Sequence, residues 1–161
     1  MIRPRASVES LRSPWAYGLL LACLVWLALV FASALFAAAG WPHSDVLRWL
    51  FHPVCHQIPA RSFHLLGEPL AACARCTGLY VGFTLGVAAW PQLPRLAAKL
   101  AKRPRWILVF MVPLLVDVMF ESGAPMRFAT GLVAAFPCAL LPLLAIAEMT
   151  VARTPKGDDP G

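Results

Sequence analysis

Charged residues are scarce in this chain. Of its 161 residues, 14 are lysine or arginine and 8 are aspartate or glutamate. The charged fraction of 14% compares with roughly 25% in soluble domains. So little charge argues against an ordinary soluble domain, and the hydrophobic fraction of 60% predicts an integral membrane protein. The 15 prolines and 10 glycines fit that class, because neighbouring membrane helices satisfy the backbone groups freed at kinks.

Acidic residues are fewer than basic ones, which leaves a formal net charge of +6. A basic balance can indicate nucleic-acid binding, but here the basic residues are dispersed and collect beside apolar runs. They do not form a phosphate-binding face for nucleic acid. Their positions favour a role in setting the topology of the chain in the bilayer.

Four apolar segments are candidates for membrane spans, since a spanning helix needs about 20 apolar residues. They cover residues 16–39, 70–90, 106–120 and 128–147. The first carries no charge. The second contains Arg75 near its start, where an arginine can reach the headgroups by snorkelling. We therefore predict an all-α fold, an integral membrane four-helix bundle.

The basic residues also predict the orientation. They precede the first span, fill the connection between the second and third, and follow the fourth. The positive-inside rule then places both termini in the cytoplasm of a multi-pass protein of the inner (plasma) membrane. The expected parts are a basic cytoplasmic arm at 1–14, a single transmembrane domain at 15–149 with an outward loop at 40–69, and a polar cytoplasmic tail at 150–161. Within the loop, residues 45–51 predict a short interfacial helix.

Reactive side chains crowd into one stretch, where three of the five cysteines and three of the four histidines lie between residues 51 and 80. Cys73 and Cys76 share one face at a helix start, where the helix terminus and a neighbouring arginine favour a thiolate. Cys55 and His56 come from the preceding loop. Three cysteines and one histidine are a recognised tetrahedral zinc set, so we predict a metal site, most simply zinc, with these four ligands.

Other assignments of this stretch stay open. His52 and His64 are alternative fourth ligands. On an oxidising outer face the Cys73–Cys76 pair can instead form a disulfide, with Cys55 as the exchanging thiol. Such a protein would be a membrane thiol–disulfide oxidoreductase, coupled to a quinone. A closed zinc site or a disulfide that only pins the loop to the bundle is the structural alternative.

Polar residues from distant segments are predicted to meet on the same side. Asp117 falls in the outer half of the third span, and a buried charge needs a partner, which Arg75 can supply. With Arg61 and Arg127, these residues fit either an ion pair that orients helices or an anion pocket, in which Asp117 and Glu121 are ligands or proton acceptors. The pocket would make the protein a binder or transporter of anionic lipid or a small anion.

Three glycines on the second span, Gly78, Gly82 and Gly86, recur every four residues. Such a stripe lets another helix approach closely. It fits packing within the chain as well as contact with a second copy or a membrane partner.

The order of these motifs resembles a known family. CHQ stands at 55–57, RSF at 61–63 and CARCTG at 73–78, and further along come Asp117, Arg127 and Thr-Gly at 130–131. The pattern resembles the domain of unknown function 2085, a family of small predicted bacterial membrane proteins. The resemblance extends over about residues 51–131 and implies membership and a membrane location, without an activity.

Overall fold

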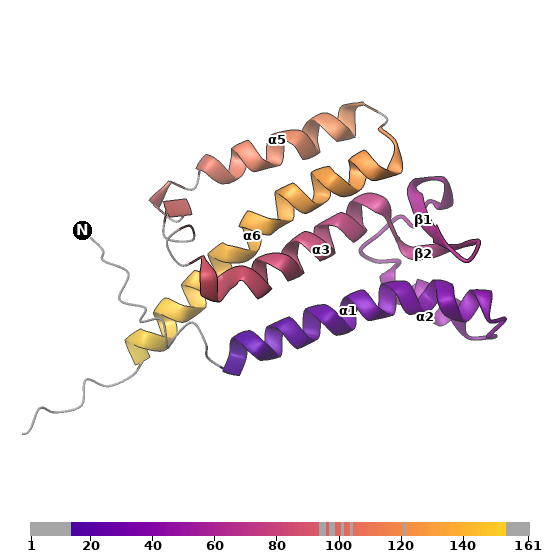
Figure 1. Ribbon diagram of the computed structural model, residues 1–161, viewed down its shortest axis with the longest axis horizontal. Coiled ribbons are helices and arrows are strands. Elements are labelled where there is room, and N and C mark those ends of the chain that lie inside the picture. The colour runs from indigo at the N-terminus through magenta and orange to yellow at the C-terminus, as the bar shows by residue number, and fades with distance from the viewer. Residues whose placement is uncertain are drawn as a thin grey trace, which may run out of the picture.

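The computed structural model describes residues 14–93, 96, 99–100, 102–103, 105–120 and 122–153. All of the predicted basic arm except Pro14, most of the predicted tail, and Glu121 lie outside these residues. The elements, in chain order, are α1 (Pro14–Ala38), α2 (Ser44–Phe51), the 3-10 turn η2 (Pro59–Arg61), β1 (Ser62–Leu65), β2 (Glu68–Cys73), α3 (Ala74–Ala89), the 3-10 turn η3 (Trp90–Gln92), α5 (Arg105–Met119) and α6 (Ala124–Arg153) (Figure 1).

The prediction of an all-α chain is wrong in one place, because β1 and β2 form an antiparallel hairpin. Two residues connect the strands, Leu66 at φ +54° and Gly67 at φ +88°. Positive φ at both positions is the signature of the tight turn whose twist matches that of the strands. The hairpin also corrects the predicted second span: its first residues, 70–73, belong to β2, and the helix begins at Ala74.

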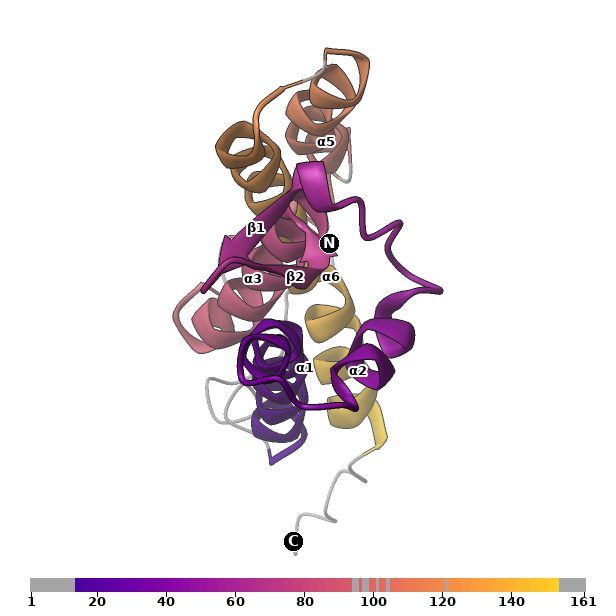
Figure 2. The ribbon, with the colours of Figure 1, turned by 90° about the vertical axis from the view of Figure 1, so that its right-hand side faces the viewer.

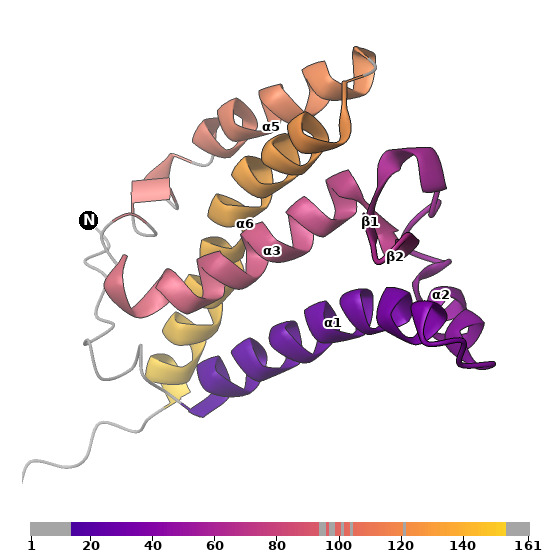
Figure 3. The same ribbon diagram turned by 45° about the vertical axis from the view of Figure 1, so that its right-hand side comes forward.

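The four long helices form a row and not a closed bundle. In the described part of the chain α6 packs on α3 along its length, α5 packs on α6, and α1 packs on α3 and β2. Figures 1 and 3 show the resulting order α5, α6, α3, α1. The predicted compact four-helix bundle therefore gives way to an open arrangement in which α5 has one main neighbour.

The glycine stripe explains the close contact between α3 and α6. A Cβ added at Gly82 would lie 2.9 Å from Leu132 Cα, and one added at Gly86 would lie 2.6 Å from the Phe136 carbonyl oxygen. Ordinary side chains would force these helices apart. The stripe is therefore used inside the chain, and α6 covers the surface that a second copy would need.

Within the described residues, two helices are long and apolar enough to cross a membrane, by length and composition: Pro14–Ala38, and residues Ala124–Ala147 of α6. The helices α3 and α5 have 16 and 15 residues, which is short of the roughly 20 that a span needs. The short helix predicted at 45–51 is present as α2, and its Trp49 is 75% exposed.

A buried cluster holds the hairpin in place at one end of the molecule. Val30 and Ala34 of α1 pack with Phe51 of α2 and with residues 70–72 of β2. The ring of Phe51 also meets Trp26 edge-on, with centroids 4.7 Å apart. Figure 2 looks onto this end, where α2, the hairpin and the start of α3 lie together. This packing fixes the direction from which the Cys55 loop approaches α3.

Candidate metal centre

Three cysteines from separate elements converge at this end of the molecule. Cys55 follows α2, Cys73 is the last residue of β2 and the N-cap of α3, and Cys76 lies in the first turn of α3. Their Sγ atoms all lie within 4.8 Å of one another. The hairpin produces this arrangement, since it carries the chain away from Cys55 and returns it to Cys73.

Backbone N–H groups point at the Cys55 sulfur. The amide of Cys73 donates to Cys55 Sγ at 3.2 Å and the amide of Gln57 donates to the same atom at 3.4 Å. Hydrogen bonds to a sulfur stabilise the charged form over the neutral one. Cys55 is also buried, so its sulfur is held in a fixed position facing the other two.

The Cys73 thiol lies at the N-terminus of α3, where the partial positive charge of the helix end favours an anion. Hydrogen bonds from the Cys55 and Cys76 thiols hold the pKa of Cys73 well below its usual range, and the bond from Cys55 has the larger effect. Thr77 Oγ1 donates to the Cys73 carbonyl at 3.1 Å and so fastens the first turn of the helix. The cluster thus stabilises a thiolate in a site built from backbone and side-chain donors.

Gln57 acts as a clamp that sequence reasoning missed. Its backbone adopts φ +51°, and its side-chain Nε2 donates to the carbonyls of Arg48 in α2 and of Ala71 in β2. These bonds tie both walls of the site together and turn the Gln57 amide toward Cys55. The signal was present in the CHQ motif, where a glutamine directly follows two candidate ligands.

A cavity of about 570 Å³ opens beside the sulfurs. Its walls carry three cysteines, three arginines and two histidines: Cys55, Cys73, Cys76, Arg61, Arg75, Arg127, His52 and His56. The predicted ligand His56 thus lines the cavity with an exposed side chain, and it does not join the close group that the three sulfurs form. His64 lies on β1 opposite Pro69, away from the cavity lining.

The predicted ion pair between Arg75 and Asp117 is present. Arg75 Nε donates to Asp117 Oδ2 at 2.9 Å, and Nη2 donates to the same oxygen and to the Asp117 main-chain carbonyl. Asp117 is only 3% exposed, and it is the buried residue of α5. The pair therefore links α5 to the start of α3, directly beside the cysteines.

The start of α6 brings Arg127 to the same cavity. Its side chain is 8% exposed, and its Nε donates to the Ser122 carbonyl at 2.6 Å. Close approach of α6 to this point depends on Gly131, because a Cβ there would lie 2.5 Å from the Arg75 carbonyl oxygen. The Thr-Gly step of the motif is thus a packing requirement of the site.

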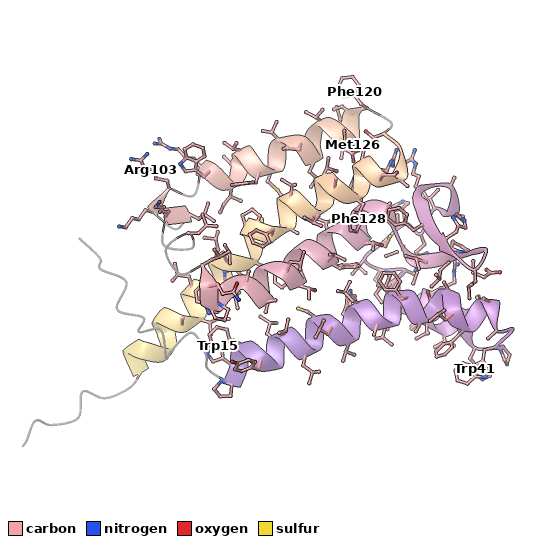
Figure 4. The ribbon with its side chains drawn as sticks, in the orientation of Figure 1. Trp15, Trp41, Arg103, Phe120, Met126 and Phe128 are labelled. Carbon is pink, nitrogen blue, oxygen red and sulfur yellow. The ribbon has the colours of Figure 1, made fainter. Side chains whose placement is uncertain are left out.

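The three residues of the RSF motif have different positions and contacts. Arg61 is exposed on the cavity wall. The buried Ser62 donates its hydroxyl to the Ile58 carbonyl at 2.9 Å. Phe63 packs edge-on against Phe128 of α6, with ring centroids 5.7 Å apart, at the hairpin end of the view in Figure 4. The motif therefore joins the hairpin to α6.

Comparison with known proteins matches residues 55–141 to the family described as "Predicted membrane protein (DUF2085)". The chain belongs to this family. The match begins at Cys55 and contains the three clustered cysteines and the three arginines of the cavity. The family description agrees with the two candidate spans found among the described residues.

Two relatives of this DUF2085 member come from archaea. An uncharacterized protein of Methanocaldococcus jannaschii is 29% identical over 129 residues, which is 73% of this chain and 83% of that protein. An uncharacterized protein of Methanothermobacter thermautotrophicus is 33% identical over 98 residues, or 56% of this chain and 86% of that protein. These comparisons do not show the bacterial source that the resemblance implied. No solved structure matches the chain.

Proposed function

We propose that this DUF2085 protein is a multi-pass membrane protein whose outward-facing cysteine cluster binds a metal ion, zinc. One observation carries the proposal: three Sγ atoms from separate elements lie within 4.8 Å of one another. In a tetrahedral zinc site with Zn–S bonds of about 2.3 Å, the sulfurs are about 3.8 Å apart. Each pair therefore needs to approach by at most about 1 Å.

The donor set and its surroundings favour zinc. Thiolates are soft ligands that select zinc and related metals over magnesium or calcium. Metal ligands have to be deprotonated, and the low pKa of Cys73 supplies one thiolate. Two backbone amides hold the Cys55 sulfur in position beside it. Three thiolates leave one position of a tetrahedral site for a further ligand. His56 is the residue that we propose for it, because it follows Cys55 directly and lines the same cavity.

The proposed topology has four spans with both termini in the cytoplasm, in the inner (plasma) membrane. Large apolar side chains are exposed along α1 and α5, including Leu21, Leu108 and Leu115. Such surfaces suit contact with lipid more than with water. At 1.5 Å per residue, the 16 residues of α3 reach about 24 Å. Local thinning of the bilayer around α3 and the 15-residue α5 would make up the difference from a core of about 30 Å.

Elemental analysis of the protein purified in detergent tests the metal site. Wild type should contain about one zinc ion per chain, and Cys73→Ser should lose it. Cys138→Ser, a half-buried position in the middle of α6, is the matched control and should keep its zinc. The His56→Ala variant should bind zinc more weakly. Folded wild type without metal after growth in zinc-supplemented medium, or full zinc in Cys73→Ser, would overturn the proposal.

Thiol–disulfide exchange is a second candidate function, favoured by the position of Cys73. This residue is the N-cap of α3 and Cys76 follows one turn later, an arrangement that suits a reactive thiolate. A Cys73–Cys76 disulfide would accept two electrons from a partner dithiol and later pass them to an oxidant such as a quinone. Alkylation of thiols in intact cells followed by mass spectrometry tests this function. Full reduction of all three cysteines at every growth stage would exclude such cycling.

A further inference from the structure

The cavity beside the cysteines carries an anion-binding wall that the proposed metal centre does not require. We infer that Arg127, with Arg75 and Arg61, binds a phosphate-type oxyanion in this cavity, either as free phosphate or as the headgroup of an anionic phospholipid. The inference stands on the arginines and their partners, so it holds with or without zinc at the sulfurs.

Arg127 is a buried guanidinium with one side-chain hydrogen bond among the described residues. This guanidinium lines the cavity although its residue is only 8% exposed. Among the residues that the structure describes, its side chain makes one hydrogen bond, from Nε to the neutral carbonyl of Ser122. A buried charge is costly without a charged or strongly hydrogen-bonded partner. The remaining N–H groups of Arg127 are therefore available to a ligand that carries negative charge.

Arg75 and Arg127 both interact with the same acidic residue, Asp117. Asp117 is the acidic partner of Arg75, through bonds to its carboxylate and its main-chain carbonyl, and it also interacts electrostatically with Arg127. Within the described residues, Asp117 is the carboxylate that the two guanidinium groups share. The three side chains together leave one positive charge beside the cavity.

The sulfurs do not take up these donors. Cys55 Sγ accepts from backbone amides of Gln57 and Cys73. The hydrogen bonds described above for Arg75 and Arg127 go to Asp117 and Ser122 and not to a cysteine sulfur. The arginines and the thiols therefore form two neighbouring walls of one cavity, each with its own chemistry.

The shape and position of the cavity indicate the class of ligand. A volume of about 570 Å³ falls within the range of roughly 300–1,000 Å³ typical of pockets for organic ligands. A guanidinium fork matches the oxygen geometry of phosphate. The same end of the molecule exposes Trp41 and Trp49 (Figure 4 labels Trp41), and tryptophans of membrane proteins concentrate at headgroup depth. A phosphate at this depth is the chemistry of a phospholipid headgroup.

Calorimetric titration of the full chain in a non-ionic detergent tests the inference, with inorganic phosphate and with a short-chain phosphatidylglycerol as separate probes. Wild type should bind at least one probe at a single site. Arg127→Gln should weaken that binding about tenfold or more, which corresponds to about 1.4 kcal/mol. Arg103→Gln removes the same charge from an exposed position at the opposite end of the molecule and should leave binding unchanged (Figure 4).

Two further measurements keep the outcome unambiguous. Arg61→Gln changes an exposed side chain on the cavity wall, so it should preserve the fold and still weaken binding several-fold even if Arg127→Gln unfolds. Zinc content is measured in every sample, so that loss of anion binding with zinc retained separates this inference from the metal proposal. Binding of phosphate supports a free oxyanion, and binding of the lipid alone supports a headgroup. Binding of neither, or equal loss in Arg103→Gln and Arg127→Gln, overturns the inference.

Discussion

The close contact between α3 and α6 predicts that a single added methyl group, the Cβ of Gly82→Ala, destabilises the protein. Gly82 lies in the middle of α3, and a Cβ added there would approach the Leu132 backbone, with Cα at 2.9 Å and the carbonyl carbon at 3.0 Å. Contacts below 3.4 Å are rare for real Cβ atoms, and backbone atoms cannot rotate aside. Gly82→Ala therefore forces the two helices apart by about 0.5 Å or more.

The expected size of the effect follows from two opposing terms. Replacing glycine by alanine inside a helix stabilises it by about 1 kcal/mol, while overpacking a close contact costs about 1–3 kcal/mol. The overpacking cost should be near the upper end of its range, because the atoms nearest the added Cβ are backbone atoms of Leu132. Gly82→Ala should therefore lower the free energy of unfolding by about 2 kcal/mol. Gly18 in α1 is the matched control, since nothing lies within 4 Å of its added Cβ. Gly18→Ala should be neutral or stabilising by up to about 1 kcal/mol.

Unfolding in detergent micelles, driven by added sodium dodecyl sulfate and followed by helical circular dichroism, measures both variants under the same conditions. The two free energies should differ by about 2–3 kcal/mol, with Gly82→Ala the less stable. Equal stability of the two variants would refute the reasoning, because it would mean that α3 and α6 are not in backbone contact at this position.

Two more predictions concern the surroundings of the cysteines. Asp117→Asn removes the charged partner of Arg75 and should cost about 2 kcal/mol of unfolding free energy; the Arg75 side chain is 24% exposed, so the cost is below the range for a fully buried pair. The control is Asp45→Asn at an exposed position of α2, which should cost at most about 1 kcal/mol. Equal losses in the two variants would show that the Arg75–Asp117 pair does not stabilise the fold. Gln57→Ala leaves two carbonyls without their donor, so we expect the free energy of unfolding to fall by about 1–3 kcal/mol. The variant should also release zinc at a lower chelator concentration than wild type. An unchanged chelator midpoint would argue that Gln57 does not hold the site together.

Local sequence carried enough information for much of the secondary structure. An uncharged apolar run predicted α1, and a second long apolar segment predicted most of α6. The hairpin was missed because Leu70, Ala71 and Ala72 are apolar residues that fit the start of a helix equally well. They form part of a strand because β1 pairs with β2 on either side of them, at Pro69 and Cys73, and because α1 covers them. Strand pairing of this kind depends on a partner segment, and no local pattern reports it.

The candidate site divides in the same way. The spacing of Cys73 and Cys76 at a helix start, and the nearby Cys55, were sufficient to predict that three thiols lie close together. Buried charge in an apolar helix was sufficient to predict that Arg75 needs Asp117. These inferences hold because helix geometry and the cost of an unpaired charge act locally, whatever the rest of the fold does.

Tertiary structure alone decided what surrounds the thiols. It placed His56 on the cavity wall apart from the close group of sulfurs, made Gln57 the clamp between α2 and β2, and gave the glycine stripe to α6. Arg127 was expected on this side of the molecule, and the structure places it on the wall of the same cavity, more than fifty residues beyond Cys73. Residue types and short-range spacing determine which groups can react or pair, whereas the depth, neighbours and open space of each group arise from helix packing between segments far apart in the chain.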